Sequence, residues 1–293
     1  MIRFPGVHVA IVTPFTNDYE VDYQKLEELC NWLIEEGVDG LVPVGSLGEY
    51  ATLTAEERAK VVETVVKAAN KRVPVTVGTG APSTKQAVSW AQHAKDCGAD
   101  ALMALPPINY RPLRNEVVAH YEALSSVGLP IIAYNNPLDY PTDLTPDLLN
   151  EIAQFENVVA VKEFSGDIRR VHKILEETDL EVLIGVDNLA MEGPLCGATG
   201  WIAGVPNAFP REGVELFRLA REGKVKEATE LYRRFLPLFE FDANPQLVQS
   251  IKYMMELVGK PMGPTRPPRL PLTDESYEAV KKAFDRAAQQ LVQ

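Results

Sequence analysis

The sequence predicts a (β/α)8 barrel followed by a helical extension. Short apolar runs alternate with amphipathic segments eight times, at spacings of about 17 to 33 residues. A single barrel accommodates the 293 residues, although two smaller domains have the same total length. A doubly wound sheet is the alternative, but the turn TPFTND after the first run lacks the G-x-G-x-x-G pattern that holds a pyrophosphate.

Eight apolar runs are the candidate strands. They are rich in β-branched and aliphatic side chains, as parallel strands covered on both faces usually are. Their expected ranges are 7–15, 40–45, 73–80, 100–107, 130–137, 158–164, 181–187 and 200–205. Because barrel enzymes place their chemistry at the carboxyl ends of the strands, polar residues at those ends are the candidate site.

Amphipathic segments after the strands predict helices, beginning with residues 23–36. Two pairs match capping boxes, Thr54 with Glu57 and Ser83 with Gln86. Proline suits the first turn of a helix, where its missing N–H is not needed, so we expect helices to start at Pro146 and Pro210.

Residues 1–222 form the predicted catalytic barrel, and residues 223–293 form the predicted extension. Two stretches, KVKEATELYRRFLPLF and NPQLVQSIKYMMELVG, keep helical periodicity. A proline-rich connection, PMGPTRPPRLPL, leads to a last helix, SYEAVKKAFDRAAQQLV. The extension is too short of strands to build its own sheet, so we expect it to pack on the barrel flank or on a partner subunit.

The composition favours a cytoplasmic globular protein with neither a nucleic-acid nor a membrane partner. The formal net charge is −12, and no block of Lys and Arg is present to neutralise phosphates. No apolar run approaches the roughly 18 residues of a membrane-spanning helix. The first residues, MIRFPGVHVAIVTPF, lack the long apolar segment and cleavage site of a signal peptide.

Cysteines and histidines have the spacing of packing residues rather than ligands. The three cysteines form no C-x-x-C, and the four histidines show neither H-x-H nor H-x-x-x-H. The residues concerned are Cys30, Cys97, Cys196, His8, His93, His120 and His172. We therefore predict no disulfide, no metal site and no cofactor.

Lys162 is the strongest candidate for a reactive residue. It lies in the predicted strand NVVAVKEF, where it shares a face with Val158, Ala160 and Phe164. Burial lowers the pKa of an ammonium group and yields a neutral, nucleophilic amine, so Lys162 is a candidate Schiff-base former. The alternative is a lysine at a strand end that reaches water or pairs with a carboxylate.

The turn GSLGE after the second strand is a candidate anion site. Gly45 and Gly48 let backbone N–H groups approach a carboxylate closely, so Gly45, Ser46 and Leu47 are candidate substrate contacts. A plain turn is the alternative interpretation, because a glycine-rich turn by itself is common.

Three other strand ends contribute candidates. Tyr134 lies on the same face as Ile132 and is either a proton carrier in the barrel mouth or a hydrogen-bonded core residue. Asp187 either orients a substrate hydroxyl or caps the next helix. The eighth strand, GATGWIAGV, contains glycines that bring the backbone close to a ligand, and Ile202 in it is a candidate contact.

Together, GSLGE, YNNP, VKEFSGD, GVD and GATGWIAG resemble the dihydrodipicolinate synthase / N-acetylneuraminate lyase family in their order and approximate spacing. The resemblance implies a barrel with a C-terminal helical extension, usually a homotetramer, that binds a 2-keto acid as a Schiff base. It implies that Lys162 forms the imine, that Tyr134 relays protons and that the Ser46 hydroxyl links this relay.

The sequence departs from the family pattern around the substrate. Leu47 replaces a second threonine of many members, so only its backbone remains to bind a carboxylate. The synthase uses an arginine beyond YNxP for the carboxylate of its aldehyde, whereas Asp139, followed by Tyr140, occupies that place here. The tyrosine that the synthase lends across a subunit interface falls at Asn109, one residue before Tyr110.

One branch of the family matches further. YPTDLTPDLL, SGDIRR, GWIAGVPNAFPREG, LFRLAREGK, DANPQLVQSIK and TRPPRLPL look like the 1-pyrroline-4-hydroxy-2-carboxylate deaminases of hydroxyproline degradation. This resemblance implies transimination by Lys162, with 2-oxoglutarate semialdehyde and ammonia as products and with Asp187, Asp139 and Tyr140 at the distal end of the substrate. A pyruvate-dependent aldolase or 4-hydroxy-tetrahydrodipicolinate synthase is the alternative, and a non-catalytic keto-acid-binding barrel is the third hypothesis.

Overall fold

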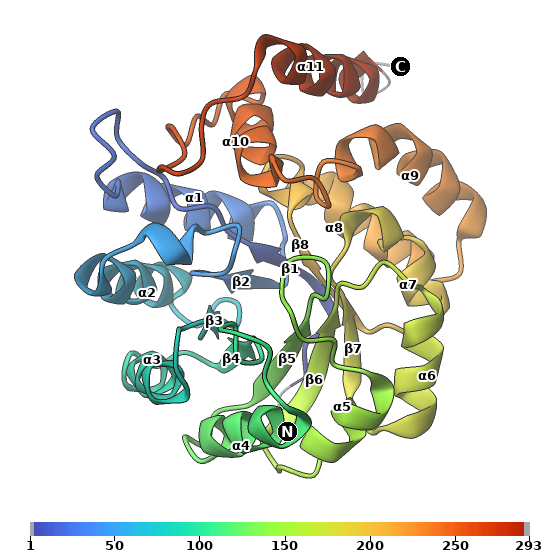
Figure 1. Ribbon diagram of the computed structural model, residues 1–293. Coiled ribbons are helices and arrows are strands. Elements are labelled where there is room, and N and C mark those ends of the chain that lie inside the picture. The colour runs from blue at the N-terminus through green and yellow to red at the C-terminus, as the bar shows by residue number, and fades with distance from the viewer. Residues whose placement is uncertain (1–2, 290–293) are drawn as a thin grey trace.

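The computed structural model describes residues 3–289 and confirms the predicted barrel (Figure 1). Eight parallel strands form one sheet in the order β2-β1-β8-β7-β6-β5-β4-β3. The strands are β1 Gly6–Ala10, β2 Gly40–Val42, β3 Thr76–Gly78, β4 Ala101–Ala104, β5 Ile131–Asn135, β6 Val158–Glu163, β7 Glu181–Ile184 and β8 Gly200–Ala203.

The ring closes between the two ends of this order, β2 and β3. Leu41 and Val75 form a parallel bridge there, and the Leu41 N–H donates to the carbonyl of Pro74 at 3.1 Å. Every strand is shorter than predicted, because a strand ends where the neighbouring strands no longer provide backbone hydrogen-bond partners. In β1 the paired register stops at Ala10, opposite Val42, so the rest of the first apolar run continues as a loop.

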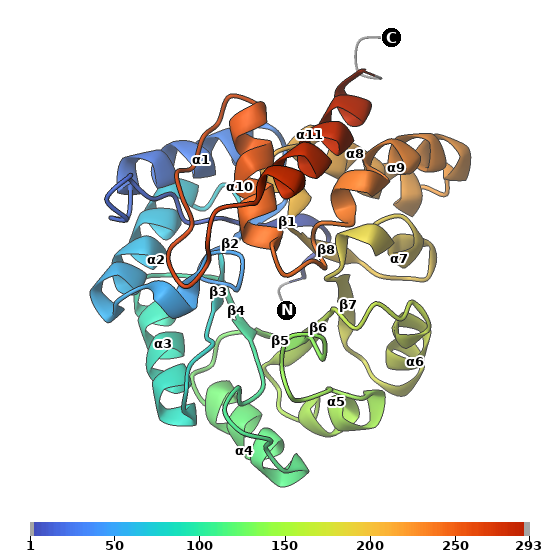
Figure 2. The same cartoon turned by 45° about the horizontal axis from the view of Figure 1, so that its top comes forward.

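Helices surround the strands and cover their outer face (Figure 2). Those of the barrel are α1 Tyr23–Glu35, α2 Ala55–Ala69, α3 Thr84–Asp96, α4 Arg114–Ser125, α5 Pro146–Ile152, α6 Arg169–Glu177, α7 Glu192–Leu195 and α8 Pro210–Arg221, with 3₁₀ turns η1 Tyr50–Thr52, η2 Asp187–Leu189 and η3 Val205–Asn207.

The predicted helix starts are largely confirmed. Thr54 and Glu57 form a complete capping box at α2, and the two prolines open α5 and α8. At α3 only half of the predicted box forms: Ser83 accepts from the Gln86 N–H, but the Ser83 hydroxyl donates to the Gln86 side chain. The Gln86 side-chain oxygen therefore accepts from the Ser83 hydroxyl instead of from the Ser83 backbone N–H.

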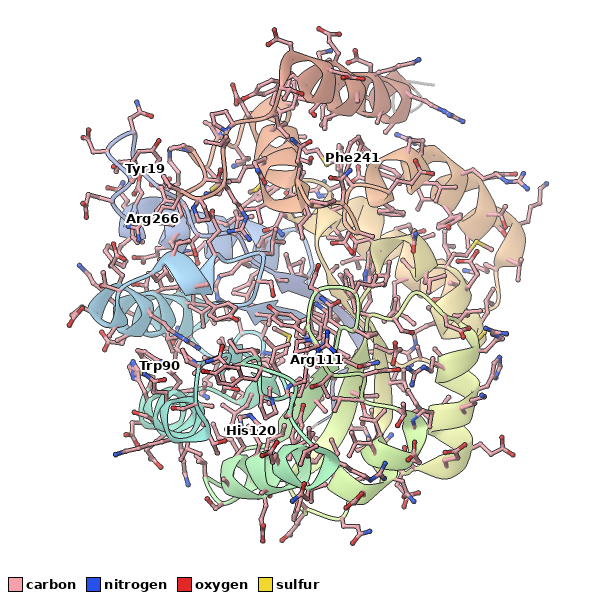
Figure 3. The ribbon with its side chains drawn as sticks, viewed as in Figure 1. Tyr19, Trp90, Arg111, His120, Phe241 and Arg266 are labelled. Carbon is pink, nitrogen blue, oxygen red and sulfur yellow. The ribbon has the colours of Figure 1, made fainter. Side chains whose placement is uncertain are left out.

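The extension contains α9 Val225–Phe239, α10 Leu247–Leu257 and α11 Asp274–Gln289. α9 packs beside α8, α10 lies over the barrel near α1, and α11 packs against α9 and α10 (Figures 1 and 2). Arg266, in the connection between α10 and α11, donates to the carbonyl of Tyr19 and pairs with Glu57, and Figure 3 shows it beside Tyr19. Among residues 3–289, no helix is long and apolar enough to cross a membrane.

A buried ion pair also joins the extension to the barrel. Lys252 of α10 places its Nζ 3.0 Å from Glu49 Oε1, and both side chains are almost completely buried. The ammonium also donates to the carbonyl of Pro264, and the second Glu49 oxygen accepts from the Arg266 N–H. Glu49, the last residue of GSLGE, thus holds the extension against the turn that borders the candidate site.

We predict that Lys252→Met lowers the free energy of unfolding by about 3 to 5 kcal/mol, because it leaves the Glu49 carboxylate buried without its lysine. Chemical denaturation measures the change. Lys226→Met, on the exposed side of α9, is the control and should change the stability by less than about 0.5 kcal/mol. Equal stabilities for the two variants would show that the ion pair does not hold the extension.

Candidate active site

Lys162 lies inside the barrel, close to the carboxyl end of β6. The register pairs it with Tyr134 of β5 and Leu183 of β7, and the lysine is 5% exposed. Its Nζ lies 4.3 Å from the centre of the Tyr134 ring and 5.4 Å from that of Phe164. Within residues 3–289 the Nζ atom makes no hydrogen bond, so its position does not fit a lysine that reaches water or pairs with one carboxylate.

Burial lowers the pKa of Lys162 from 10.5 to about 8. The negative charges of Asp242, Asp187 and Asp139 oppose this shift, since they favour the ammonium form. A substantial fraction of the amine is therefore neutral near pH 8, as nucleophilic attack on a carbonyl requires.

Lys252 is the second buried lysine, and its surroundings differ. Burial lowers its pKa to about 8 as well. Its Nζ, however, is held by Glu49 and by the Pro264 carbonyl, outside the cavity that contains Lys162. Of these two buried lysines, only Lys162 combines a lowered pKa with access to a cavity.

The GSLGE turn faces this cavity with two free backbone donors. Within the described part of the chain, the N–H groups of Ser46 and Leu47 donate to no protein atom, and both residues line the cavity. Left-handed backbone at Val44 (φ 51°) and Glu49 (φ 56°) flanks the turn, a conformation that is uncommon for a β-branched residue. The Thr13 hydroxyl donates to the Gly48 carbonyl at 2.7 Å and fixes the turn.

Hydroxyl and amide groups connect Tyr134 with its neighbours. Asn136 Nδ2 donates both to the Tyr134 hydroxyl, at 3.1 Å, and to Asp139 Oδ2, at 2.8 Å. The hydroxyls of Ser46 and Tyr140 lie 2.8 Å apart. Burial raises the pKa of Tyr134, and hydrogen bonds from Asn136 and Ser46 oppose that rise, so the phenol keeps its proton at neutral pH.

Asp187 binds the protein rather than the cavity. Its carboxylate accepts from the Trp201 indole N–H at 3.0 Å and from the backbone N–H groups of Gly204 and Val205. Burial raises its pKa to about 6, and these donors lower it in part. The bonds occupy both oxygens and tie the end of β7 to the loop after β8.

Asp242 is a site residue that the sequence did not reveal. It precedes α10, accepts from the Asp187 N–H at 3.1 Å and lines the same cavity as Lys162. Burial and the Asp187 charge raise its pKa well above the ordinary value. Phe241, its neighbour, lies on the connection between α9 and α10 (Figure 3). The sequence argument selected polar residues at the carboxyl ends of strands, and Asp242 does not follow a strand. Its only signal in the sequence is an acidic side chain in the connection FDANP before a helix.

A small cavity of about 30 Å³ lies beside Lys162. It is lined by Ala10, Gly45, Ser46, Leu47, Met103, Tyr134, Asp139, Lys162, Phe164, Ile202, Ala203, Gly204, Asp242 and Leu247. Seven of the residues expected from the sequence are therefore brought together, while Asp187 and Tyr140 lie behind the wall. Among these lining residues Lys162 is the only cation, and the carboxylates of Asp139 and Asp242 face it.

Asn109 and Tyr110 lie away from this group. Asn109 donates its side-chain amide to the Pro82 carbonyl at 2.9 Å, whereas Tyr110 has left-handed backbone and is 93% exposed. A separate set of donors, Glu63, His93 and Cys97, lies between α2 and α3 with all ligand atoms within 4.8 Å. It is outside the barrel and takes no part in the lysine site.

A family model described as the dihydrodipicolinate synthetase family matches residues 3–287. A 4-hydroxy-tetrahydrodipicolinate synthase of Jannaschia sp. is 37% identical over 286 residues, which cover 97% of this chain and 98% of the relative. A relative of the same name from Methanospirillum hungatei is 34% identical over 291 residues, 97% of this chain and 99% of the relative.

A solved structure, chloride-inhibited dihydrodipicolinate synthase of Acinetobacter baumannii complexed with pyruvate, superimposes with a TM-score of 0.92 at 33% identity, covering 98% of this chain and 99% of the other. The chain therefore belongs to the dihydrodipicolinate synthetase family and is a class I lyase that uses a lysine Schiff base. The names of the relatives support the synthase alternative better than the hydroxypyrroline deaminase.

We predict that Asp187→Ala lowers the free energy of unfolding by about 3 kcal/mol or more, because three buried donors each lose an acceptor at about 1 to 3 kcal/mol. Chemical denaturation followed by tryptophan fluorescence measures it. Asp187→Asn should lose less, since one acceptor oxygen remains. Asp139→Ala, an exposed carboxylate of the same site, is the control; wild-type stability in Asp187→Ala together with a raised KM would assign Asp187 to the substrate instead.

Proposed function

We propose that this member of the family forms a Schiff base between Lys162 and the C2 carbon of a small 2-oxo acid such as pyruvate. The enamine formed from this Schiff base would add to an aldehyde in the aldol direction, or would form when an aldehyde is cleaved from a larger 2-oxo acid. The observation that carries the proposal is the buried Lys162 amine, which lines a cavity, has no hydrogen-bond partner in residues 3–289 and has a pKa lowered to about 8.

The substrate carboxylate binds the GSLGE turn in this proposal. Within residues 3–289, the N–H groups of Ser46 and Leu47 donate no hydrogen bond to another protein atom, and both residues line the cavity together with Lys162. Two backbone donors suit the two oxygens of one carboxylate, and they do so without the side-chain hydroxyl that Leu47 lacks. The carboxylate thereby fixes C2 in front of the lysine.

Imine formation then follows from the groups present. Neutral Lys162 Nζ adds to C2, its proton passes to the substrate oxygen, and a further proton releases that oxygen as water. The protonated imine withdraws electrons from C2, so a C3 proton leaves and the neutral enamine forms. The ring of Tyr134 lies against Lys162 Nζ and its phenol is protonated, so Tyr134 is the candidate to exchange these protons.

The distal end of the cavity favours a substrate with a single carboxylate. Lys162 is the only cation among the lining residues, and Asp139 holds the place of the arginine that the synthase uses. A second carboxylate would face Asp139 and Asp242. A pyruvate-dependent aldolase with a neutral, hydroxylated aldehyde therefore fits these charges better than lysine biosynthesis does.

Deamination of 1-pyrroline-4-hydroxy-2-carboxylate is the second candidate, and Asp242 is the observation that favours it. Burial and the Asp187 charge raise the pKa of Asp242 well above the ordinary value, which favours its protonated form, and a protonated carboxyl group in the cavity can protonate a leaving hydroxyl. Lys162 would open the ring by transimination. The net reaction consumes one water and releases ammonia together with 2-oxoglutarate semialdehyde.

We also propose a cytoplasmic homotetramer, supported by the family resemblance. Sedimentation equilibrium tests the assembly, and a stable monomer at micromolar concentration would contradict it.

Borohydride reduction in the presence of pyruvate should add one covalent adduct to the wild-type chain and none to Lys162→Ala, as measured by intact mass. The trapping rate should rise about tenfold per pH unit below pH 8 and level off above it, because the ammonium form cannot attack and its fraction falls as the pH passes the pKa. A pH-independent rate, or an adduct that persists in Lys162→Ala, would sink the assignment.

Two assays in parallel separate the candidates. We expect pyruvate to be released from hydroxylated 2-oxo acids in a retro-aldol panel, and Asp242→Asn to retain most of that activity. Ammonia released from hydroxypyrroline carboxylate, and lost by at least tenfold in Asp242→Asn, would instead assign the deaminase. Condensation with aspartate semialdehyde at a comparable rate would contradict the single-carboxylate proposal.

A further inference from the structure

Three side chains with metal-binding groups meet outside the barrel, between α2 and α3. Glu63 belongs to α2, His93 belongs to α3, and Cys97 caps the C-terminus of α3. One atom from each side chain, a carboxylate oxygen, a ring nitrogen and a sulfur, lies within 4.8 Å of the other two. The group is separate from the lysine site, so the proposed function leaves it unexplained.

His93 and Cys97 lie on one face of α3, one turn apart. The Cys97 N–H donates to the His93 carbonyl at 2.9 Å, which keeps the cysteine in the register of the helix. The cysteine sulfur lies 3.4 Å from Nδ1 of the ring and 3.7 Å from Nε2. Two ligands of one tetrahedral zinc ion are about 3.3 to 3.8 Å apart, since each lies about 2.0 to 2.3 Å from the metal. The helix therefore holds this pair at the separation of two zinc ligands.

Glu63 approaches the pair from the neighbouring helix, and its carboxylate is available. Among residues 3–289 the Glu63 carboxylate has neither a hydrogen bond nor an ion pair, although it lies within reach of the histidine and the cysteine. Its side chain is exposed and can turn toward the pair without loss of packing, whereas His93 and Cys97 are half-buried. An adjustable third ligand can therefore complete the set that the helix begins.

The packing of the two helices places Glu63 level with the pair. Figure 1 shows α2 and α3 side by side. Before the group, the Arg58 guanidinium of α2 lies 4.5 Å from the centre of the Trp90 ring of α3. Beyond the group, Lys71 donates to the Gly98 carbonyl at 2.7 Å. The contacts on both sides fix the register of the helices, so the approach of Glu63 follows from the barrel and not from a single rotamer.

The chemistry of the three donors favours zinc. Thiolate and imidazole ligands select zinc over magnesium and calcium, which prefer oxygen ligands, and a carboxylate is an accepted zinc ligand. A carboxylate and a thiolate together carry two negative charges, and one divalent cation neutralises both. The net charge of −12 on the whole chain also favours the approach of a cation.

We propose that Glu63, His93 and Cys97 bind one zinc ion, with water as the fourth ligand, and that this ion ties α2 to α3. Binding breaks the S–H bond of Cys97, forms a bond from sulfur to zinc and releases one proton to the buffer, without a change of oxidation state. The proposal goes beyond the proposed function and does not depend on it. It revises the sequence-based expectation that His93 and Cys97 are packing residues.

Zinc titration of the full chain tests the site. The chain is stripped with a chelator, kept reduced and titrated in competition with a chromophoric chelator. We expect one equivalent to bind, and Cys97→Ser, His93→Gln and Glu63→Gln each to weaken binding at least about tenfold, because even groups that only orient a metal ligand contribute about 10- to 100-fold. Cys196→Ser and His172→Gln make the same changes outside the group and should bind zinc as the wild type does.

Cobalt(II) in place of zinc identifies the sulfur ligand by absorption spectroscopy. A thiolate bound to cobalt gives a charge-transfer band in the near ultraviolet, and a four-coordinate ion gives intense visible bands. We expect both features in the wild type and in Cys196→Ser, and neither in Cys97→Ser. Weak visible bands alone in the wild type would indicate six-fold coordination without sulfur and would contradict the proposed ligand set.

Thermal unfolding shows whether the ion ties the two helices together. The wild-type midpoint should rise with the free zinc concentration, because zinc bound only to the folded chain stabilises it, and the midpoint of Cys97→Ser should not rise. Without zinc the two chains should unfold at nearly the same temperature, which shows that the serine variant is folded. An equal rise in both chains would argue against the site.

A wild-type chain that binds no zinc overturns the proposal. So does wild-type affinity in all three ligand variants, which would place the ion elsewhere, for example at the Asp139 and Asp242 carboxylates of the cavity. Pyruvate trapping is a separate readout, since it depends on Lys162, and Cys97→Ser should trap pyruvate as the wild type does. A wild-type chain that binds zinc but traps no pyruvate would contradict the proposed function and support the zinc site.

Discussion

The desolvation of Lys162 is the constraint on which the site depends. A strand interior that is buried on both faces holds the amine, and burial drives its pKa down toward 8. Three carboxylates around it act in the opposite direction: Asp187 and Asp242 are buried, and Asp139 is exposed. The reactivity of the amine is therefore set by a balance between burial and nearby negative charge, and the fold supplies both.

The C-terminal extension is part of the site, because one of the carboxylates that act on Lys162 belongs to it. Asp242 and Leu247 line the cavity, although both follow residue 222, where the barrel was expected to end. The Glu49–Lys252 pair holds α10 against the GSLGE turn, whose N–H groups are the carboxylate donors of the proposed function. A buried ion pair therefore connects the extension directly to this turn.

Hydroxyl groups and acidic groups lie in different parts of the site. Tyr134 and Ser46 line the cavity and Tyr140 lies behind Ser46, whereas Asp139 and Asp242 line the cavity without a second cation beside them. In the proposed function, the hydroxyl groups take part in proton transfer. The acidic groups disfavour a substrate with a second carboxylate, because it would meet like charge there.

The sequence by itself determined the barrel, the eight strand positions to within a few residues, and Lys162, because apolar runs with one lysine follow from local alternation of side chains. It also indicated the GSLGE turn and Tyr134 through their places at strand ends. Only the tertiary structure decided that Asp187 binds Trp201 and the loop after β8, that Asp242 enters from the extension, and that Tyr140 meets Ser46. Those contacts join residues that are between 14 and 94 positions apart in the chain, and local periodicity holds no information about which distant side chains meet.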